Sequence, residues 1–151
     1  MSEKKRKSSC ETFSLTLPSL PQYLRLARCF IMELADAAGF VLKDRDGICL
    51  AVGEACSNII RHSYKGSPDG IIILKCEMNE TGLRISIRDF GEKMDLSHVR
   101  PPAADVVQCG GLGLHIIKCI MDEVEFETTH QMGNEIHMIK YFPPRKDLDG
   151  S

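Results

Sequence analysis

The sequence LAVGEACSNIIRHSY, residues 50–64, places a carboxylate and a carboxamide one helical turn apart within a small, apolar segment. Glu54 and Asn58 are four residues apart, so on a helix their side chains lie on the same face. The apolar residues in and just before this segment recur at helical spacing and form a stripe that can pack on a sheet. They are Ile48, Ala51, Val52, Ala55 and Ile59.

The residues of this helix alone leave two interpretations open. In the first, the amide oxygen of Asn58 binds a hard divalent cation, which takes oxygen ligands and brings phosphates with it. Glu54 then lies near enough to act as a base, and the helix holds a magnesium nucleotide. In the second, the helix is simply amphipathic and its polar residues face water, since short motifs also match by chance.

The size and composition of the chain predict one domain. Its 151 residues, 43% of them apolar, can bury a hydrophobic core. This domain is expected at residues 10–143, between a disordered basic tail at residues 1–9 and a disordered tail at residues 144–151. The 19 basic and 21 acidic residues nearly cancel, so charge predicts neither a nucleic-acid partner nor an anionic-membrane surface.

The chain lacks an apolar run of membrane-spanning length and a signal peptide, which predicts a cytoplasmic protein. Its seven cysteines are scattered without any C-x-x-C pair. This pattern fits reduced thiols better than a disulfide framework or a zinc site.

Hydrophobic periodicity predicts the remaining elements. A strand at Cys10–Leu17 precedes a helix at Gln22–Ala38, for which Gly39 is the expected C-cap. The helix of Glu54 and Asn58 runs from about Lys43 to about Tyr64. Two hairpins and a short helix complete the fold; they are expected at Ile71–Met78 with Leu83–Arg88, at Leu114–Met121, and at Val124–Thr129 with Glu135–Phe142.

Two further polar sites are expected where elements meet. Asp89 and Gly91 follow a strand, and the turn at residues 110–113 opens the short helix. Asp89 can accept a hydrogen bond from the exocyclic amine of a purine, and the glycines let backbone N–H groups approach phosphates at a helix N-terminus. Each feature alone is commonly just a turn. Combined with Asn58, they supply the groups needed to hold magnesium ATP.

The segment between these two sites, Glu92–Cys109, shows no hydrophobic periodicity and is long for a connection in a compact domain. It is predicted to be a functional loop or lid. Arg100 within it can either reach the γ-phosphate of a nucleotide or remain a solvated loop charge.

The motifs EACSNIIRHSY, IRDFG and GGLGLHIIKCIMDEV carry a resemblance to a known family. Their order is similar to that in the ATP-binding fold shared by gyrase, the ninety-kilodalton heat-shock chaperone, histidine kinases and the MutL repair protein. Over roughly Phe13–Phe142, the chain most resembles the bacterial anti-sigma-factor serine/threonine kinases. The resemblance implies an α+β two-layer sandwich, the Bergerat ATP-binding fold, with a mixed, mostly antiparallel sheet covered on one face by about three helices.

The resemblance also implies roles for individual residues. Glu54 would be the general base that polarises the acceptor hydroxyl, and Asn58 would be the magnesium ligand. Asp89 would contact adenine, with Gly91 on the same side. The phosphates would lie over Gly111, Leu112, Gly113 and Leu114.

Three other positions qualify the resemblance. His62 lies on the same helix face, where the family also tends to have histidine, and is interpreted as structural. Arg28 falls where the family has a partner-binding arginine. Lys93 stands where the wider superfamily has the second glycine of its adenine motif, which is interpreted as a looser hinge that retains binding.

The implied function is that of an ATP-dependent protein serine/threonine kinase that uses Mg²⁺ and acts as an anti-sigma factor. Such kinases bind a sigma factor or phosphorylate a serine of a STAS-type antagonist, and they are typically homodimers. Glu54 favours this class over the catalytic domain of a histidine kinase, which usually has Asn at that position and needs an attached pair of phosphoacceptor helices. The alternative is a nucleotide-gated binding module with little or no phosphotransfer.

Overall fold

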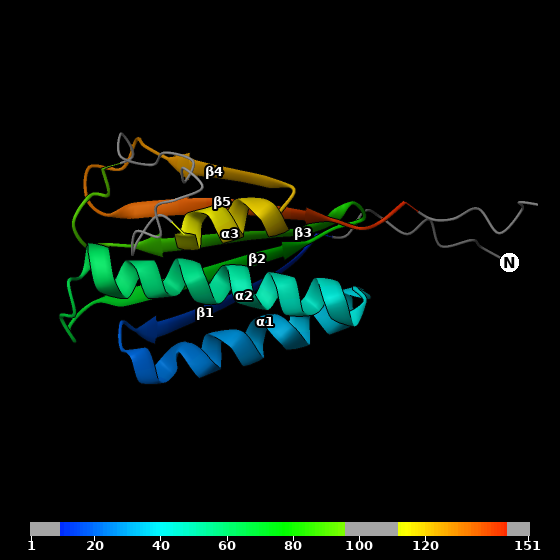
Figure 1. Ribbon diagram of the computed structural model, residues 1–151, viewed down its shortest axis with the longest axis horizontal. Coiled ribbons are helices and arrows are strands. Elements are labelled where there is room, and N and C mark those ends of the chain that lie inside the picture. Colours follow the sequence, from blue (N-terminus) through cyan, green and yellow to red (C-terminus); the bar gives the residue numbers. More distant parts are fainter. Residues whose placement is uncertain (1–9, 96–111, 145–151) are drawn as a thin grey trace, which may run out of the picture.

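The structure, a computed structural model, describes residues 10–95 and 112–144. They form a five-stranded sheet with three α-helices on one face (Figure 1). The strand order is β1-β2-β3-β5-β4, and every described pairing is antiparallel. The strands are β1 (Glu11–Pro18), β2 (Ile71–Met78), β3 (Gly82–Asp89), β4 (Glu123–Glu127) and β5 (Asn134–Tyr141).

This arrangement confirms the expected two-layer α+β sandwich, with an antiparallel sheet rather than a mixed one among the described strands. The connection between β1 and β2 explains why the first pair is antiparallel. Helices α1 (Leu24–Ala38) and α2 (Leu42–Asn58) run in opposite directions, as Figure 1 shows. Together they return the chain to the end of the sheet where β1 finished, whereas a single crossover helix would have produced a parallel pair.

The end of α1 follows the prediction. Gly39 adopts φ +94°, a left-handed conformation that glycine reaches without a steric penalty. Its N–H donates to the carbonyl of Asp36 at 2.9 Å, and the N–H of Phe40 donates to the carbonyl of Ala35 at 3.1 Å. These two bonds form a Schellman motif, which satisfies carbonyls at the helix end.

Helix α2 buries the predicted apolar stripe against the sheet. Ile48, Ala51 and Val52 are fully buried, and Ala55 and Ile59 are nearly so. Directly after Asn58 the helix widens into a π-helical turn, Ile59–Ser63, which is not predicted from the sequence. π-helical turns are frequently found at functional sites.

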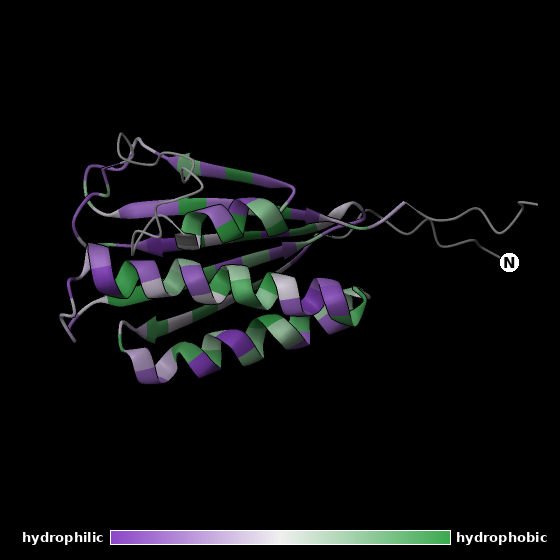
Figure 2. Ribbon diagram, in the orientation of Figure 1, coloured by the Kyte–Doolittle hydropathy of each residue, from purple (hydrophilic) through white to green (hydrophobic). Residues whose placement is uncertain are grey.

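The sheet has one apolar face and one polar face. Leu83, Ile85 and Ile87 of β3 point into the core and are buried, while Arg84 points away and is exposed. The strand ribbons in Figure 2 alternate in hydropathy accordingly. Helix α3 (Leu112–Ile120) completes the helical layer and buries Ile117.

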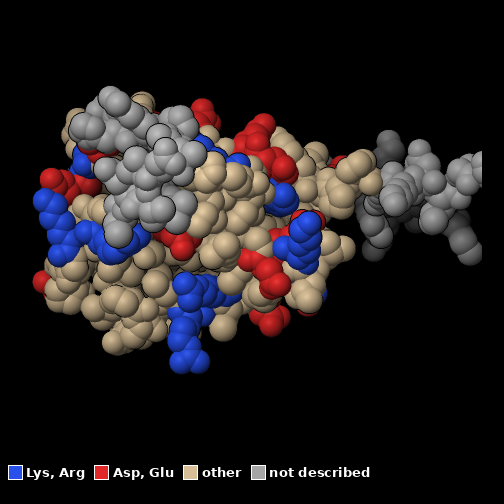
Figure 3. All heavy atoms as spheres, in the orientation of Figure 1, with Lys and Arg blue, Asp and Glu red and all other residues tan. Residues whose placement is uncertain are grey.

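The helical side of the molecule carries both signs of charge. Basic and acidic side chains are interspersed over the described surface in Figure 3, consistent with the near-zero net charge of the chain. No helix in the described ranges is long and apolar enough to cross a bilayer.

Candidate functional site

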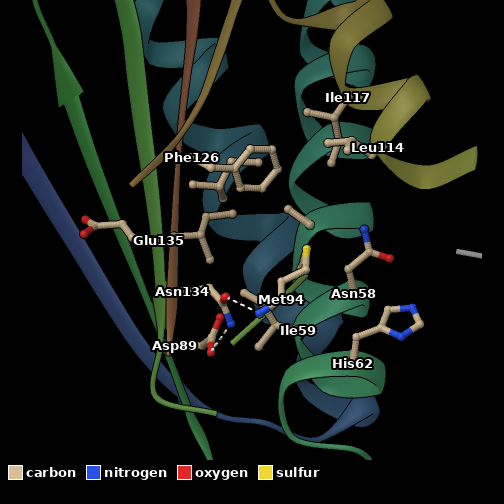
Figure 4. Close-up of a pocket in the computed structure, with 13 residues that line it drawn as sticks. Asn58, Ile59, His62, Asp89, Met94, Leu114, Ile117, Phe126, Asn134 and Glu135 are labelled. Carbon is tan, nitrogen blue, oxygen red and sulfur yellow. Dashed lines mark hydrogen bonds between the residues drawn. The ribbon is translucent and has the colours of Figure 1, made fainter. Parts of the chain in front are cut away.

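A pocket lies between α2, α3 and the ends of β3 and β5 (Figure 4). The space between its walls, open solvent included, is about 570 Å³. Its walls are largely apolar, with contributions from Ile59, Ile87 and Ile117. A few polar side chains line it as well: Asn58, His62, Asp89 and Asn134.

Asp89 ends β3 and is completely buried. Its Oδ1 accepts hydrogen bonds from the Gly91 N–H at 3.0 Å and from Asn134 Nδ2 at 3.1 Å. Its Oδ2 has no hydrogen-bond partner among the residues that the structure describes. A buried acceptor without a partner is costly, so this oxygen is suited to accept a hydrogen bond from a ligand.

The environment of Asp89 also shifts its titration. Burial raises the pKa of Asp89 above its usual value, because desolvation disfavours the carboxylate. Hydrogen bonds from Gly91 and Asn134, the nearby Ser63 hydroxyl and the charge of Arg88 oppose this shift but do not cancel it. Perturbed acids inside pockets are a common mark of functional sites.

The Asn134 side chain connects three segments around Asp89. Its Oδ1 accepts the N–H of Met94 at 2.7 Å. Its Nδ2 lies within hydrogen-bonding distance of Asp89 Oδ1 (3.1 Å), Ser63 Oγ (3.0 Å) and the Glu92 carbonyl (2.9 Å). The carboxamide therefore fixes the acid, the end of the helix and the segment after β3 relative to one another.

Asn134 is not among the site residues that the sequence predicts, because Gln131–Asn134 has the composition of a turn. The signal that identifies it is the period of two along β5. Ile136 and Met138 are buried on the helix-facing side, so the residue two positions before Ile136 lies on that side too.

Glycines allow the backbone to come close to Asp89. A Cβ on Gly91 would lie 2.4 Å from the Ser63 carbonyl oxygen, and a Cβ on Gly133 would lie 2.0 Å from the Asp89 carbonyl oxygen. Any side chain at these positions would push the segments apart. The predicted place of Gly91 beside Asp89 is thus required by packing against the end of the helix.

Arg88 supports this region from the polar face of the sheet. Its guanidinium donates to the carbonyls of Asp89 (2.6 Å), Met132 (2.9 Å) and Asn134 (3.2 Å), and stacks over the Phe90 ring at 4.4 Å. It therefore joins the end of β3 to the turn before β5.

The second half of the site lies where α3 begins. Asn58 is 8% exposed, and Glu54 is partly buried one turn earlier on α2. A Cβ on Gly113 would lie 2.8 Å from Glu54 Oε2 and 3.5 Å from Asn58 Oδ1. The structure thus brings together Glu54, Asn58 and the first turn of α3, whose backbone N–H groups can bind an anion.

Figure 4 shows Asn58, at the end of α2, and His62, in the π-helical turn that follows, on the same side of the helix and below α3, with Asp89 and Asn134 toward the sheet. Asn58 Oδ1 accepts a hydrogen bond from Arg61 Nη2 at 3.1 Å. His62 is exposed at the rim of the pocket. Arg61 is a further residue that sequence reasoning does not single out, although its spacing of three from Asn58 permits the contact.

The other predicted residues are divided between the pocket, its surroundings and the part of the chain outside the described ranges. Arg28 crosses from α1 to α2, where a Cβ on Gly53 would lie 2.9 Å from its Nε. Leu114 lines the pocket, and Leu112 is the first residue of α3. Gly111, Arg100 and most of the predicted lid lie outside the described residues.

The residues present fit a magnesium nucleotide in two respects. Asn58 offers an amide oxygen, the kind of ligand that Mg²⁺ accepts, close to an anion-binding helix start. No cluster of three or more His, Cys, Asp or Glu side chains that could hold a metal occurs within residues 10–95 and 112–144. Mg²⁺ usually binds through one or two protein groups together with substrate phosphates, so one amide oxygen beside the start of a helix is a suitable set of ligands.

The chain is similar to known proteins over most of its length. The profile of the histidine kinase-like ATPase domain matches residues 17–140. The serine-protein kinase RsbW of Listeria innocua is 30% identical over 139 residues, covering 87% of each chain. The protein of the same name in Bacillus subtilis is 25% identical over 143 residues, covering 89% of this chain and 88% of that protein.

A solved structure shares the fold. The histidine kinase domain of a blue-light activated histidine kinase from Erythrobacter litoralis superposes with a TM-score of 0.52 at 18% identity. The match covers 82% of this chain but only 61% of that chain. The chain therefore belongs to the histidine kinase-like ATPase family and, within it, to the anti-sigma-factor serine-protein kinases.

Proposed function

We propose that this protein is an ATP-dependent kinase that phosphorylates serine on a partner protein. The observation that carries the proposal is the buried Asp89 carboxylate, whose Oδ2 lacks a partner within the described residues and which lines the same pocket as Asn58. Relatives named serine-protein kinases, at 25–30% identity, support the choice of acceptor.

In the proposed complex, adenine lies at the Asp89 end of the pocket. The unpaired Oδ2 accepts a hydrogen bond from the exocyclic amine, and the apolar walls cover the faces of the base. Guanine would present a carbonyl oxygen to the same carboxylate, so the site favours adenine. Gly91 belongs to this end because it lets the backbone after β3 approach the helix.

The phosphates are proposed to lie at the start of α3, over Gly111, Leu112, Gly113 and Leu114. Asn58 would bind Mg²⁺ through its amide oxygen. When bound, the metal neutralises charge on the transferred phosphoryl group. The contribution of the chain itself is to hold the triphosphate at a helix N-terminus, where the backbone N–H groups and the helix dipole favour negative charge.

Glu54 is proposed to act as the general base. Its carboxylate takes the proton of the acceptor serine as the serine oxygen bonds to the γ-phosphorus. The bond between that phosphorus and the bridging oxygen of ADP breaks. The products are phosphoserine and ADP, and the proton remains on Glu54 until solvent removes it.

The partner is proposed to be a STAS-type antagonist, with a sigma factor as a second partner. The family of the chain supports this assignment. We further propose that residues 10–143 act as one kinase domain, that the protein works in the cytoplasm, and that it forms a homodimer.

Transfer of label from γ-labelled ATP tests the proposal. The purified protein is incubated with Mg²⁺, labelled ATP and a lysate of the source organism, beside the variants Glu54→Gln and Asn58→Ala. The expected result is a small protein labelled on serine by the parent only, with ATP binding retained by Glu54→Gln in calorimetry. Retained ATP binding without any labelled protein would refute the proposed kinase activity. It would favour the alternative function, a nucleotide-gated binding module.

A further inference from the structure

A guanidinium already occupies the oxygen proposed to bind the metal. Arg61 Nη2 donates to Asn58 Oδ1 at 3.1 Å. Helix side chains lean toward the N-terminus of their helix, so an arginine three residues after Asn58 reaches back to it naturally. Asn58 is 8% exposed, and among the described residues Arg61 is the hydrogen-bond partner of its amide oxygen.

The surroundings of Arg61 differ from those of an ordinary surface arginine. It lies in the π-helical turn Ile59–Ser63, directly after the helix that carries Glu54 and Asn58. It forms no ion pair with any carboxylate in the described part of the chain. Its positive charge is therefore directed to a neutral amide beside the pocket and remains available to an anion.

Arg61 and a divalent cation cannot both hold this amide oxygen at low cost. A Mg²⁺ ion coordinates oxygen at 2.0–2.1 Å and would stand close to the guanidinium, with like charges facing each other. Once a triphosphate is present, Arg61 gains a partner that suits the planar guanidinium better than an amide does. Arrival of the metal and departure of Arg61 from Asn58 are then coupled.

We propose that Arg61 is a positioning residue that takes the place of the metal at Asn58 in the nucleotide-free protein and transfers to the phosphates when the metal nucleotide binds. This inference rests on the proposed function. It has one direct consequence: Arg61 supplies positive charge to ATP even without Mg²⁺, so the parent protein tolerates loss of the metal better than a variant without the arginine.

The test measures the affinity for ATP by calorimetry in Mg²⁺ and again in EDTA. The quantity compared between variants is the dissociation constant in EDTA divided by the dissociation constant in Mg²⁺. Arg61→Gln removes the charge and keeps a polar side chain. Arg84→Gln, on the exposed polar face of the sheet, removes the same charge away from the helices and serves as the matched control. Arg61→Lys keeps the charge but loses the planar fork. Circular dichroism confirms that each variant is folded.

Arg61→Gln is expected to raise the ratio about tenfold over the parent, the scale of one lost hydrogen bond to a charged group. Arg84→Gln is expected to leave the ratio unchanged, and Arg61→Lys to give an intermediate value. An unchanged ratio in Arg61→Gln, whether both affinities stay at the parental values or fall together, would overturn the exchange at Asn58 and leave the proposed function intact. Absence of ATP binding by the parent in both buffers would instead refute the proposed function itself, and this inference with it.

Discussion

At the scale of single residues, the proposed recognition of adenine depends on a difference between the two oxygens of Asp89. Oδ1 is saturated by Gly91 and Asn134, while Oδ2 has no partner in the described residues. A carboxylate held through one oxygen cannot rotate to satisfy the other. The second oxygen is therefore a fixed acceptor, which matches the fixed amine of adenine.

The variant Asp89→Asn tests this recognition with almost no change of shape. Its amide oxygen can keep the bonds to Gly91 and Asn134, but an NH₂ group replaces Oδ2 and would face the adenine amine as a second donor. We expect the affinity for ATP to fall about 10- to 100-fold, corresponding to a hydrogen bond to a charged group. Calorimetry measures this change, and unchanged affinity would remove Asp89 from the adenine site.

We also expect Asp89 to make the free energy of unfolding depend on pH, and Asp89→Asn to remove that dependence. Burial raises the pKa of Asp89 in the folded protein, so the folded state binds this proton more tightly than the unfolded state does. The contribution of Asp89 to the free energy of unfolding therefore falls as pH rises from the ordinary aspartate pKa of about 4 through the raised value. Below this pH window, Asp89 is protonated in both states and no charge is buried on folding. Above the window, the folded protein bears the full cost of burying the carboxylate.

Urea unfolding of the parent and Asp89→Asn, without nucleotide, from about pH 4 to about pH 7 measures this effect. We expect the stability of the variant relative to the parent to increase with pH across this range. A difference that stays constant, or that shrinks as pH rises, would contradict the assignment. Taking the difference removes the contribution of the other acids, which titrate alike in both proteins.

At the scale of elements, the site depends on how closely α3 approaches α2. The space for a side chain at Gly113 is already filled by Glu54 Oε2 and, at a slightly greater distance, by Asn58. Gly113 thus permits the start of one helix to meet the functional face of another. This contact places a proposed base and a proposed phosphate site within reach of the same bond.

Gly113→Ala is therefore expected to lower the rate of phosphotransfer while leaving the stability of the fold nearly unchanged. Alanine favours the helix by about 1 kcal/mol, but its methyl group would lie 2.8 Å from Glu54 Oε2 and displace the carboxylate. We expect unfolding midpoints close to those of the parent and a rate of phosphotransfer reduced by at least about tenfold, as is common when a reacting group is misplaced. A parental rate in single-turnover assays would show that Glu54 does not act from this position.

The elements also show which parts of the site are readable from sequence. Two apolar runs separated by a turn predict β2 and β3, with alternation along β3, and the spacing of Glu54 and Asn58 predicts a shared helix face, because these patterns are local in sequence. The π-helical turn leaves no such pattern, since it arises from a single widened turn. Asn134 is obscured for a different reason: a polar residue at the start of a strand resembles a turn residue until its partners across the sheet are known.

Lys93 illustrates how a departure from a family motif is accommodated. The wider superfamily has glycine at this position, but here the side chain is exposed and its Nζ lies 3.5 Å from the Thr128 carbonyl. Gly91, two residues earlier, makes the close approach that excludes a side chain. The steric requirement for glycine thus falls on Gly91, and the lysine side chain extends to the surface.

At the scale of the whole molecule, one hydrophobic core joins the sheet to the helices. It contains two cysteines, one from the helical layer and one from the sheet, whose reactivity can be used to follow unfolding. Cys56 of α2 and Cys76 of β2 are both fully buried. Burial raises the pKa of each thiol to about 12. Both thiols are protected from alkylation, because the reagent cannot reach them and because they stay protonated whereas the thiolate is the reactive form.

Pulsed alkylation followed by mass spectrometry is therefore expected to distinguish fast-reacting exposed thiols from slow-reacting buried thiols. Cys10, Cys29 and Cys119 are exposed and should react at once, whereas Cys56 and Cys76 should react together and only as fast as the molecule unfolds. A ligand that binds only the folded state lowers the unfolded population by a factor of 1 + [L]/Kd. Saturating Mg-ATP should consequently slow alkylation of both buried thiols by the same factor while leaving the exposed ones unaffected. Protection of Cys56 alone would mean that α2 opens separately from the sheet, and that nucleotide binding stabilises the helical layer without stabilising the core as one unit.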